Sequence, residues 1–156
     1  QYFDPELGES YVPYVVETSI GLDRMFLTIL SHAFREEQLE NGESRVVLKI
    51  PALLAPIKAA ILPLTKKDGM PEKAREIMKS LQIDFNCQYE EKDSIGKRYR
   101  RQDAIGTAFC ITVDHQTLED NTVTIRDRDT MEQERVSVEK LHAIIAEKVN
   151  ITKYLT

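Results

Sequence analysis

The clearest pattern of apolar and polar residues lies in the first quarter of the chain. Seven apolar residues recur there at three-and-four spacing: Leu22, Met25, Phe26, Ile29, Leu30, Ala33 and Phe34. This spacing places all seven on one face of a helix, and Asn41-Gly42 is a typical stop signal. Residues 11–18, just before the helix, are rich in aromatic and β-branched types. They predict a strand, with Pro13 indicating an edge position or a strand start.

After a polar connection that carries Glu36, Glu37, Glu40 and Glu43, strand and helix patterns alternate. Strands are predicted over 46–50, 57–64, 84–89, 107–114 and 122–128. The last two are joined by a polar loop at 119–121, so we expect them to pair antiparallel. Helices are predicted from Pro71 to Leu81, from Ser94 as N-cap to Gly106, and from Val138 to Val149. The change of pattern predicts two units, 1–43 and 44–156, of which the second is an α/β domain.

The composition is that of a globular protein. Of 156 residues, 42% are apolar and 30% are charged, which excludes a disordered polyelectrolyte. No run of about 18 uncharged apolar residues exists, so a membrane-spanning helix is not expected. The start at Gln1 shows no signal-peptide pattern, and we expect the chain to begin within a longer protein. Cys87 and Cys110 lack metal or disulfide spacing, so we expect inert thiols in a reducing, cytoplasmic setting.

Residues 17–24, where the first predicted strand meets the helix, form a candidate ligand site. Gly21 would let a ligand approach the backbone, and the free N–H groups of a first helical turn attract phosphate. Arg24 would add a cation at the helix end where it least suits the helix dipole. Glu17 would suit an ammonium group. The plainer interpretation, a helix capped by Ser19 with solvated charges, is favoured by local chemistry alone, because short anion-site patterns are weak.

A second candidate is the basic cluster on the helix that follows Ser94. It holds Lys97, Arg98, Arg100 and Arg101. One helix face can carry Arg101 with Arg98 or Lys97, and that face could follow a phosphate backbone while Tyr99 stacks on a base or packs on the sheet. A solvated face paired to the acids at 90–93 remains equally open. The formal net charge of −5 does not decide between them.

Two further arginines, Arg126 and Arg128, alternate with Asp127 and Asp129 in a predicted strand. Both arginines then point to one face, either as a basic stripe or, more in keeping with the alternating acids, in cross-strand salt bridges. The three histidines, at 32, 115 and 142, do not cluster, so no metal site is expected.

These segments resemble a known family. Residues 11–30, YVPYVVETSIGLDRMFLTIL, are similar to the third signature motif of class II aminoacyl-tRNA synthetases, with its Gly-x-x-Arg element. Residues 55–64, APIKAAILPL, and 94–134 resemble the anticodon-binding domain of the glycyl, histidyl, prolyl and threonyl enzymes. The details are most similar to glycyl-tRNA synthetases of the bacterial homodimeric type. The resemblance covers nearly the whole chain.

The resemblance implies a fold and a function. The fold would be α/β: an anticodon-binding domain with a mixed, mainly parallel sheet of about five strands flanked by three helices, after a strand-helix remnant of the class II catalytic domain. The function would be that of the C-terminal part of an enzyme that attaches glycine to its tRNA through glycyl-adenylate. The alternative is a non-catalytic interaction module that reuses the fold. Intact residues at positions 17, 19 and 24 favour the enzyme.

The resemblance also implies site residues. Glycine would be held by Glu17, Thr18, Ser19, Ile20 and Gly21, and ATP by Gly21, Leu22, Asp23 and Arg24. The anticodon region of glycine tRNA would meet Lys97, Arg98, Arg100, Arg101, Arg126 and Arg128. ATP with Mg²⁺, glycine and homodimer formation belong to the full-length enzyme. The fragment lacks the upstream motifs, so we expect it to be inactive alone, to hold no cofactor, and to bind neither membrane nor DNA.

Overall fold

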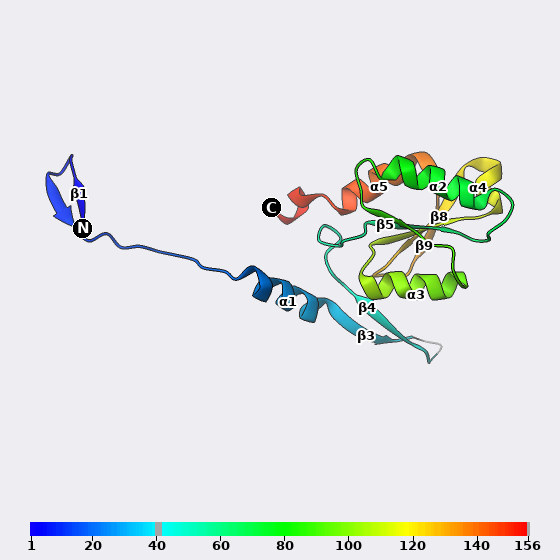
Figure 1. The fold of residues 1–156 in the computed structure, drawn as a ribbon, viewed down its shortest axis with the longest axis horizontal. Helices are drawn as coiled ribbons and strands as arrows, with labels where there is room; N and C mark the ends of the chain where they lie inside the picture. The colour runs from blue at the N-terminus through cyan, green and yellow to red at the C-terminus, as the bar shows by residue number, and fades with distance from the viewer. Residues whose placement is uncertain (40–41, 156) are drawn as a thin grey trace.

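A five-stranded mixed sheet forms the centre of the protein (Figure 1). The computed structural model describes residues 1–39 and 42–155, with 153 and 154 as backbone only. The strands are β5 (Ala59–Pro63), β6 (Cys87–Tyr89), β7 (Phe109–Val113), β8 (Thr122–Asp127) and β9 (Gln133–Ser137), in the order β6-β5-β7-β8-β9. The β5 strand is parallel to β6 and β7, whereas β8 pairs antiparallel with β7, as predicted, and with β9. The sheet is therefore mixed as predicted, but it is not mainly parallel, because two pairings are parallel and two are antiparallel.

Helices cover both faces of the sheet (Figure 1). One face carries α2 (Met70–Leu81), α5 (Leu141–Lys148) and the short α4 (His115–Asp120), and the other carries α3 (Ile95–Ile105). Every residue of β5 and β7 is buried. Burial on two faces explains why these strands are continuous apolar runs in the sequence. The single-turn helices η1 (Val138–Lys140) and η2 (Ile151–Tyr154) flank α5.

The predicted helices α2, α3 and α5 and the predicted strands of this domain are confirmed, but two elements were missed. Helix α4 begins where Asp114 and Thr117 form a reciprocal capping box, and it is followed by the C-cap residue Asn121 with φ 55°. The prediction of a loop at 119–121 is therefore wrong for 119–120. Strand β9 has a charged and polar sequence, which is common at a sheet edge because it discourages pairing with other chains. Ser94 occupies the N-cap position of α3 without a side-chain cap bond.

Helix α1 (Leu22–Ala33) is also confirmed, but it ends well before Asn41-Gly42, whose Asn41 lies outside the described residues. The chain passes from α1 straight into β3 (Phe34–Gln38), which pairs antiparallel with β4 (Ser44–Leu48). The predicted polar connection is thus wrong for 36–38, because cross-strand pairing outweighs the polar sequence. The predicted division near residue 43 falls between the two strands of this hairpin.

The predicted strand at 11–18 is wrong. Only Tyr11 lies in a strand, as the end of β2 (Glu9–Tyr11), which pairs with β1 (Tyr2–Asp4). Residues 12–20 form neither helix nor strand and run as an extended segment away from the sheet (Figure 1). A strand needs a neighbour for its backbone N–H and C=O groups, and none lies beside this segment within the described part of the chain. Its apolar side chains, such as Tyr14 and Val16, are exposed.

Candidate nucleic-acid interface

On the α3 side of the sheet, β8 and β9 present polar side chains that are at least partly exposed, except for Arg126, which is buried against α3. Residues Val123, Ile125 and Val136 point into the core beneath α2 and α5. The residues that alternate with them along each strand lie on the α3 side of the sheet. There Ile95 and Tyr99 of α3 pack over β5 and β7, so much of β8 and β9 stays accessible. We call this the β8–β9 polar face; it consists of Thr122, Thr124, Arg126, Gln133 and Arg135. Thr124 pairs with Arg135 and Arg126 pairs with Gln133 across the two strands.

A cavity of about 470 Å³ opens between α3 and this face. We call it the α3 pocket; it is lined by Gly96, Lys97, Tyr99 and Arg100 of α3, Arg126 of β8, Gln133 of β9, Met131 and Glu43. Three cations, one carboxylate, one amide and one aromatic ring thus surround a space of the size of ordinary small-ligand pockets. Anionic ligands with hydrogen-bonding edges, such as nucleotides, suit this lining.

Arg126 is held rigidly at the floor of the α3 pocket. Its guanidinium lies 4.9 Å from the centre of the Tyr99 ring, and it donates two hydrogen bonds to the Asp103 carboxylate at 2.8 and 3.0 Å. Burial disfavours its charge, yet the bonds to Asp103 raise the pKa of Arg126 overall, so it stays a cation. The Tyr99 hydroxyl lies 2.7 Å from Thr112 Oγ1, and burial raises the pKa of Tyr99.

Asp103 belongs to a wider buried network of charges. Arg45 of β4 donates to Asp103 at 3.2 Å, to the Arg128 carbonyl at 3.0 Å and to Glu37 of β3 at 2.8 Å. Hydrogen bonds from Lys49 and then Arg45 outweigh burial and lower the pKa of Glu37. The network therefore joins the β3–β4 hairpin, α3 and the sheet.

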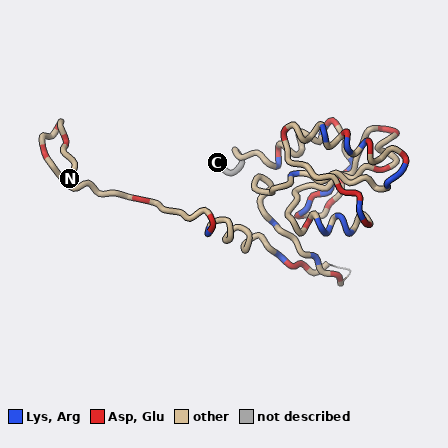
Figure 2. The backbone as a smooth tube through the Cα atoms, viewed as in Figure 1, with Lys and Arg blue, Asp and Glu red and all other residues tan. Residues whose placement is uncertain are grey.

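The six arginines and lysines predicted to meet tRNA occupy two kinds of position. Lys97 is exposed, Arg100 is partly exposed, and both line the α3 pocket with Arg126. Figure 2 shows that cations recur along α3. Arg128 is buried and donates to Asp129 and to the Gly106 carbonyl. Among the described residues, neither arginine forms the predicted cross-strand salt bridge: Arg126 pairs with Asp103 of helix α3, and Arg128 pairs with its neighbour Asp129.

The other two predicted residues bind protein groups at the carboxyl ends of β5 and β6. Arg98 is buried and donates to the Pro63, Leu64 and Glu90 carbonyl oxygens, and its Nε has no partner among the described residues. Burial lowers the pKa of Arg98. Arg101 donates to Glu90 at 2.6 Å and Asp93 at 2.9 Å. For Arg101, the plainer interpretation, pairing with the acids at 90–93, is confirmed.

The opposite face of the sheet carries a cavity of contrasting charge. This space of about 660 Å³ has an apolar floor that includes Phe109 and Ile144. Its polar lining includes Asp127, Glu132 and Glu134 against the single cation Lys148. Phosphate groups would be repelled there, whereas cations predominate in the α3 pocket.

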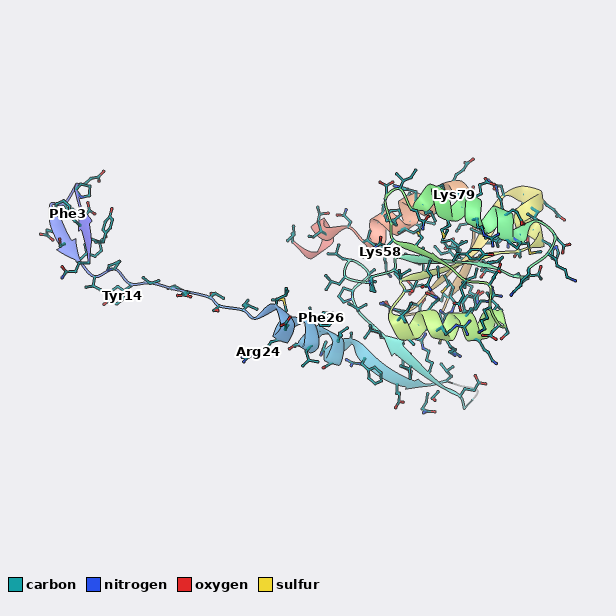
Figure 3. All side chains as sticks on the ribbon, in the orientation of Figure 1. Phe3, Tyr14, Arg24, Phe26, Lys58 and Lys79 are labelled. Carbon is teal, nitrogen blue, oxygen red and sulfur yellow. The ribbon has the colours of Figure 1, made fainter. Side chains whose placement is uncertain are left out.

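The residues predicted to bind glycine and ATP lie far from this domain. Residues 17–20 belong to the extended segment, Gly21 is the N-cap of α1 with φ −77°, and Leu22, Asp23 and Arg24 form its first turn. Figure 3 shows Arg24 well away from the sheet. Within the described part of the chain, the side chains of Glu17, Ser19 and Arg24 take part in no hydrogen bond or ion pair. Within the described residues, therefore, no side chain from another element lies opposite this candidate site to enclose a ligand.

Other reactive groups carry no evident chemistry. Both cysteines are free, and burial raises the pKa of Cys87 to about 11 and that of Cys110 to about 12, as expected for inert thiols. Lys58 donates to three carbonyl oxygens of residues 52–55, and burial lowers its pKa. Across residues 1–39 and 42–155, no three His, Cys, Asp or Glu side chains group as metal ligands. No described helix is long and apolar enough to cross a membrane.

Sequence reasoning missed several pocket residues. Met131 and Gln133 went unnoticed because strand β9 was not predicted, and Glu43 was assigned to a polar connection. The available signal was the alternate placement of Gln133, Arg135 and Ser137 along the chain. A search for period-two spacing in this charged segment would have predicted a strand.

The fold defines a class of α/β domain in which helices cover both faces of a mixed five-stranded sheet. The fold is similar to the RNA binding domain of threonyl-tRNA synthetase from Cryptosporidium parvum, with a TM-score of 0.58 and 22% identity over 64% of this chain and 25% of that chain. Residues 58–148, more than half of the chain, match the anticodon binding domain family. The chain belongs to that family.

Curated relatives cover more than this domain. Glycine–tRNA ligase of Clostridium tetani is 54% identical over 148 residues, or 95% of this chain and 32% of the relative. That of Chlorobaculum tepidum is 52% identical over 96% of this chain and 32% of the relative, and that of Borrelia hermsii is 47% identical over 96% and 34%. The chain thus spans about a third of the length of the curated relatives it matches.

Proposed function

We propose that this chain is the C-terminal, anticodon-binding part of a glycyl-tRNA synthetase, of class II and of the bacterial homodimeric type. The observation that carries the proposal is the extent of the likeness to glycine–tRNA ligases. At 52–54% identity it covers 95–96% of the chain, and so includes residues well outside the anticodon-binding domain match at 58–148. The whole protein would join glycine to its tRNA with ATP in the cytoplasm.

The α3 pocket supports a role in reading the anticodon. Glycine codons share two guanines, so their anticodons share two cytosines. A cytosine offers one amino donor and two acceptors along its pairing edge, which a carboxylate and guanidinium groups complement. Glu43 supplies the carboxylate, and Arg100 supplies donors. Because Arg126 lies over Tyr99, a base would stack on the guanidinium plane, with Lys97 placed for a backbone phosphate.

The N-terminal residues fit a role that requires the rest of the protein. In the full-length enzyme, Glu17 to Gly21 would hold glycine, and Gly21 to Arg24 would hold ATP with Mg²⁺. The exposed apolar side chains of α1, among them Leu22, Phe26 and Leu27, would be covered by the upstream two-thirds and by the second subunit. By itself the present chain would not activate glycine, because it offers no opposing wall for these ligands.

The test is a titration of the full-length enzyme with glycine tRNA and with the same tRNA altered at either anticodon cytosine. We expect each alteration to weaken binding by about 1–3 kcal/mol. Equal affinity for all three RNAs would contradict anticodon reading. Normal ATP–pyrophosphate exchange by an Arg24→Ala variant would count against the ATP role and favour a non-catalytic module that reuses the fold.

A further inference from the structure

We propose that Asp103 is the positioning residue of the α3 pocket: it fixes the guanidinium of Arg126 for base contact, and through Arg45 it joins the pocket to the β3–β4 hairpin. This inference rests on the proposed anticodon-binding function, because its readout is discrimination among tRNA anticodons.

The geometry around Asp103 is that of a clamp. The residue is 1% exposed. One carboxylate oxygen accepts from Arg126 Nη1 at 2.8 Å, and the other accepts from Arg126 Nη2 at 3.0 Å. Two parallel bonds of this kind fix the plane of a guanidinium as well as its position. The Tyr99 ring supports the same plane from one side. The remaining freedom of Arg126 is therefore small, and it lines the pocket with its orientation set in advance.

The charge balance makes Asp103 hard to replace. Its second oxygen also lies 3.2 Å from Arg45 and 3.7 Å from Arg100, which lines the same pocket. One carboxylate thus serves three guanidinium groups. Among the described residues, Asp103 is the sole carboxylate paired with Arg126. Without its charge, Arg126 and Arg100 would repel each other across the pocket and would lose the shared anchor.

The Asp103 carboxylate also connects the N-terminal region of the chain to the α3 pocket. Arg45 binds Asp103 with one nitrogen and Glu37 with another, so both strands of the β3–β4 hairpin are tied to α3. Strand β3 follows α1 without a linker. The Arg45–Asp103 contact would therefore be one link, in the full-length enzyme, between the proposed glycine and ATP residues and the base-reading pocket.

The test compares Asp103→Asn with Asp129→Asn in the full-length enzyme. Asp129 pairs with another buried arginine, Arg128, which does not line the α3 pocket, so this variant controls for loss of a carboxylate beside a buried cation. For Asp103→Asn we expect the affinity ratio between normal and cytosine-altered tRNA to fall by on the order of tenfold. KM for tRNA should rise, and tRNA-independent ATP–pyrophosphate exchange should be unchanged. The Asp129→Asn variant should retain the ratio of the unaltered enzyme.

A double-mutant cycle with Arg126→Met separates positioning from general support of the fold. If Asp103 acts through Arg126, adding Asp103→Asn to Arg126→Met should leave the affinity ratio unchanged. The double variant removes one positive and one negative charge, so it does not leave a single unpaired buried charge. The comparison of Arg126→Met with the double variant therefore still tests the proposal if Asp103→Asn alone fails to fold. An unchanged ratio in Asp103→Asn, equal losses in both Asp variants, or a further loss in the double variant would overturn the inference. Absence of discrimination in the unaltered enzyme would instead overturn the proposed function.

Discussion

The two faces of the five-stranded sheet are stabilised by different chemistry. Beneath α2 and α5 the contacts are almost wholly apolar, with Ile61, Ile111 and Leu141 fully buried. Beneath α3 a small apolar cluster adjoins the charged network of Asp103 and its arginines. Apolar burial is strong but has no direction, whereas paired charges fix orientation and add little net stability. The face that carries the candidate interface is the one in which orientation matters.

The largest expected effect is on the apolar face. Ile61 lies at the centre of β5 with no exposed surface, so Ile61→Ala should lower the free energy of unfolding by about 2–5 kcal/mol through lost burial and a cavity. Urea unfolding measures this loss. Ile83→Ala is the control, because Ile83 is 81% exposed and should change stability by less than about 0.5 kcal/mol. Similar losses at both positions would contradict the assignment of the core.

A smaller effect is expected at the edge of the β8–β9 polar face. Hydrogen bonds from Arg135, at 2.5 and 2.9 Å, are the main cause that lowers the pKa of Asp114, which also caps α4. The unfolded chain therefore takes up a proton at higher pH than the folded protein. This stabilisation is fully present above the ordinary carboxyl range and is lost as the pH falls from about 5 through the lower folded pKa.

Asp114→Asn should accordingly cost about 1 kcal/mol at pH 7, since the pair is partly exposed, and should flatten the acid side of the stability profile. Urea unfolding from pH 7 to pH 3 measures both. Glu119→Gln on the same helix, with an exposed side chain, should keep the original profile. If the free energy of unfolding of Asp114→Asn fell with pH as steeply as that of the unaltered protein, the bonds between Asp114 and Arg135 would not persist in solution.

The smallest change in stability is expected for a variant of Lys97, which should instead change the binding of tRNA. Lys97→Ala removes an exposed cation at the α3 pocket, so the slope of log affinity for glycine tRNA against log salt should fall by roughly one. Lys79→Ala is the matched control, since Lys79 projects from the outer side of α2 on the opposite face (Figure 3). Its slope should not change. Equal slopes for both variants would remove the distinction between the faces in RNA binding.

Local patterns in the sequence predicted most helices and the central strands. Helix α1 and helix α2 follow from apolar spacing, and β5 and β7 from apolar runs, because their burial selects residue types along each segment. Strands β3 and β9 escaped prediction because their stability comes from pairing with another strand while their side chains are mostly polar. The converse error at 11–18 has the same origin: strand-forming residues without a neighbouring strand do not make one.

For the candidate site, the sequence by itself determined which residue types were available: a basic cluster at 97–101 and arginines alternating with aspartates after residue 125. Only the tertiary structure decided their use. In the structure, Arg98 is buried and donates to carbonyl oxygens, Arg126 pairs with Asp103, and Lys97 and Arg100 line a pocket. The physical reason is that an ionic partner is set by distance in space: Arg45 and Asp103 are separated by 58 positions in the chain and by 3.2 Å in the fold.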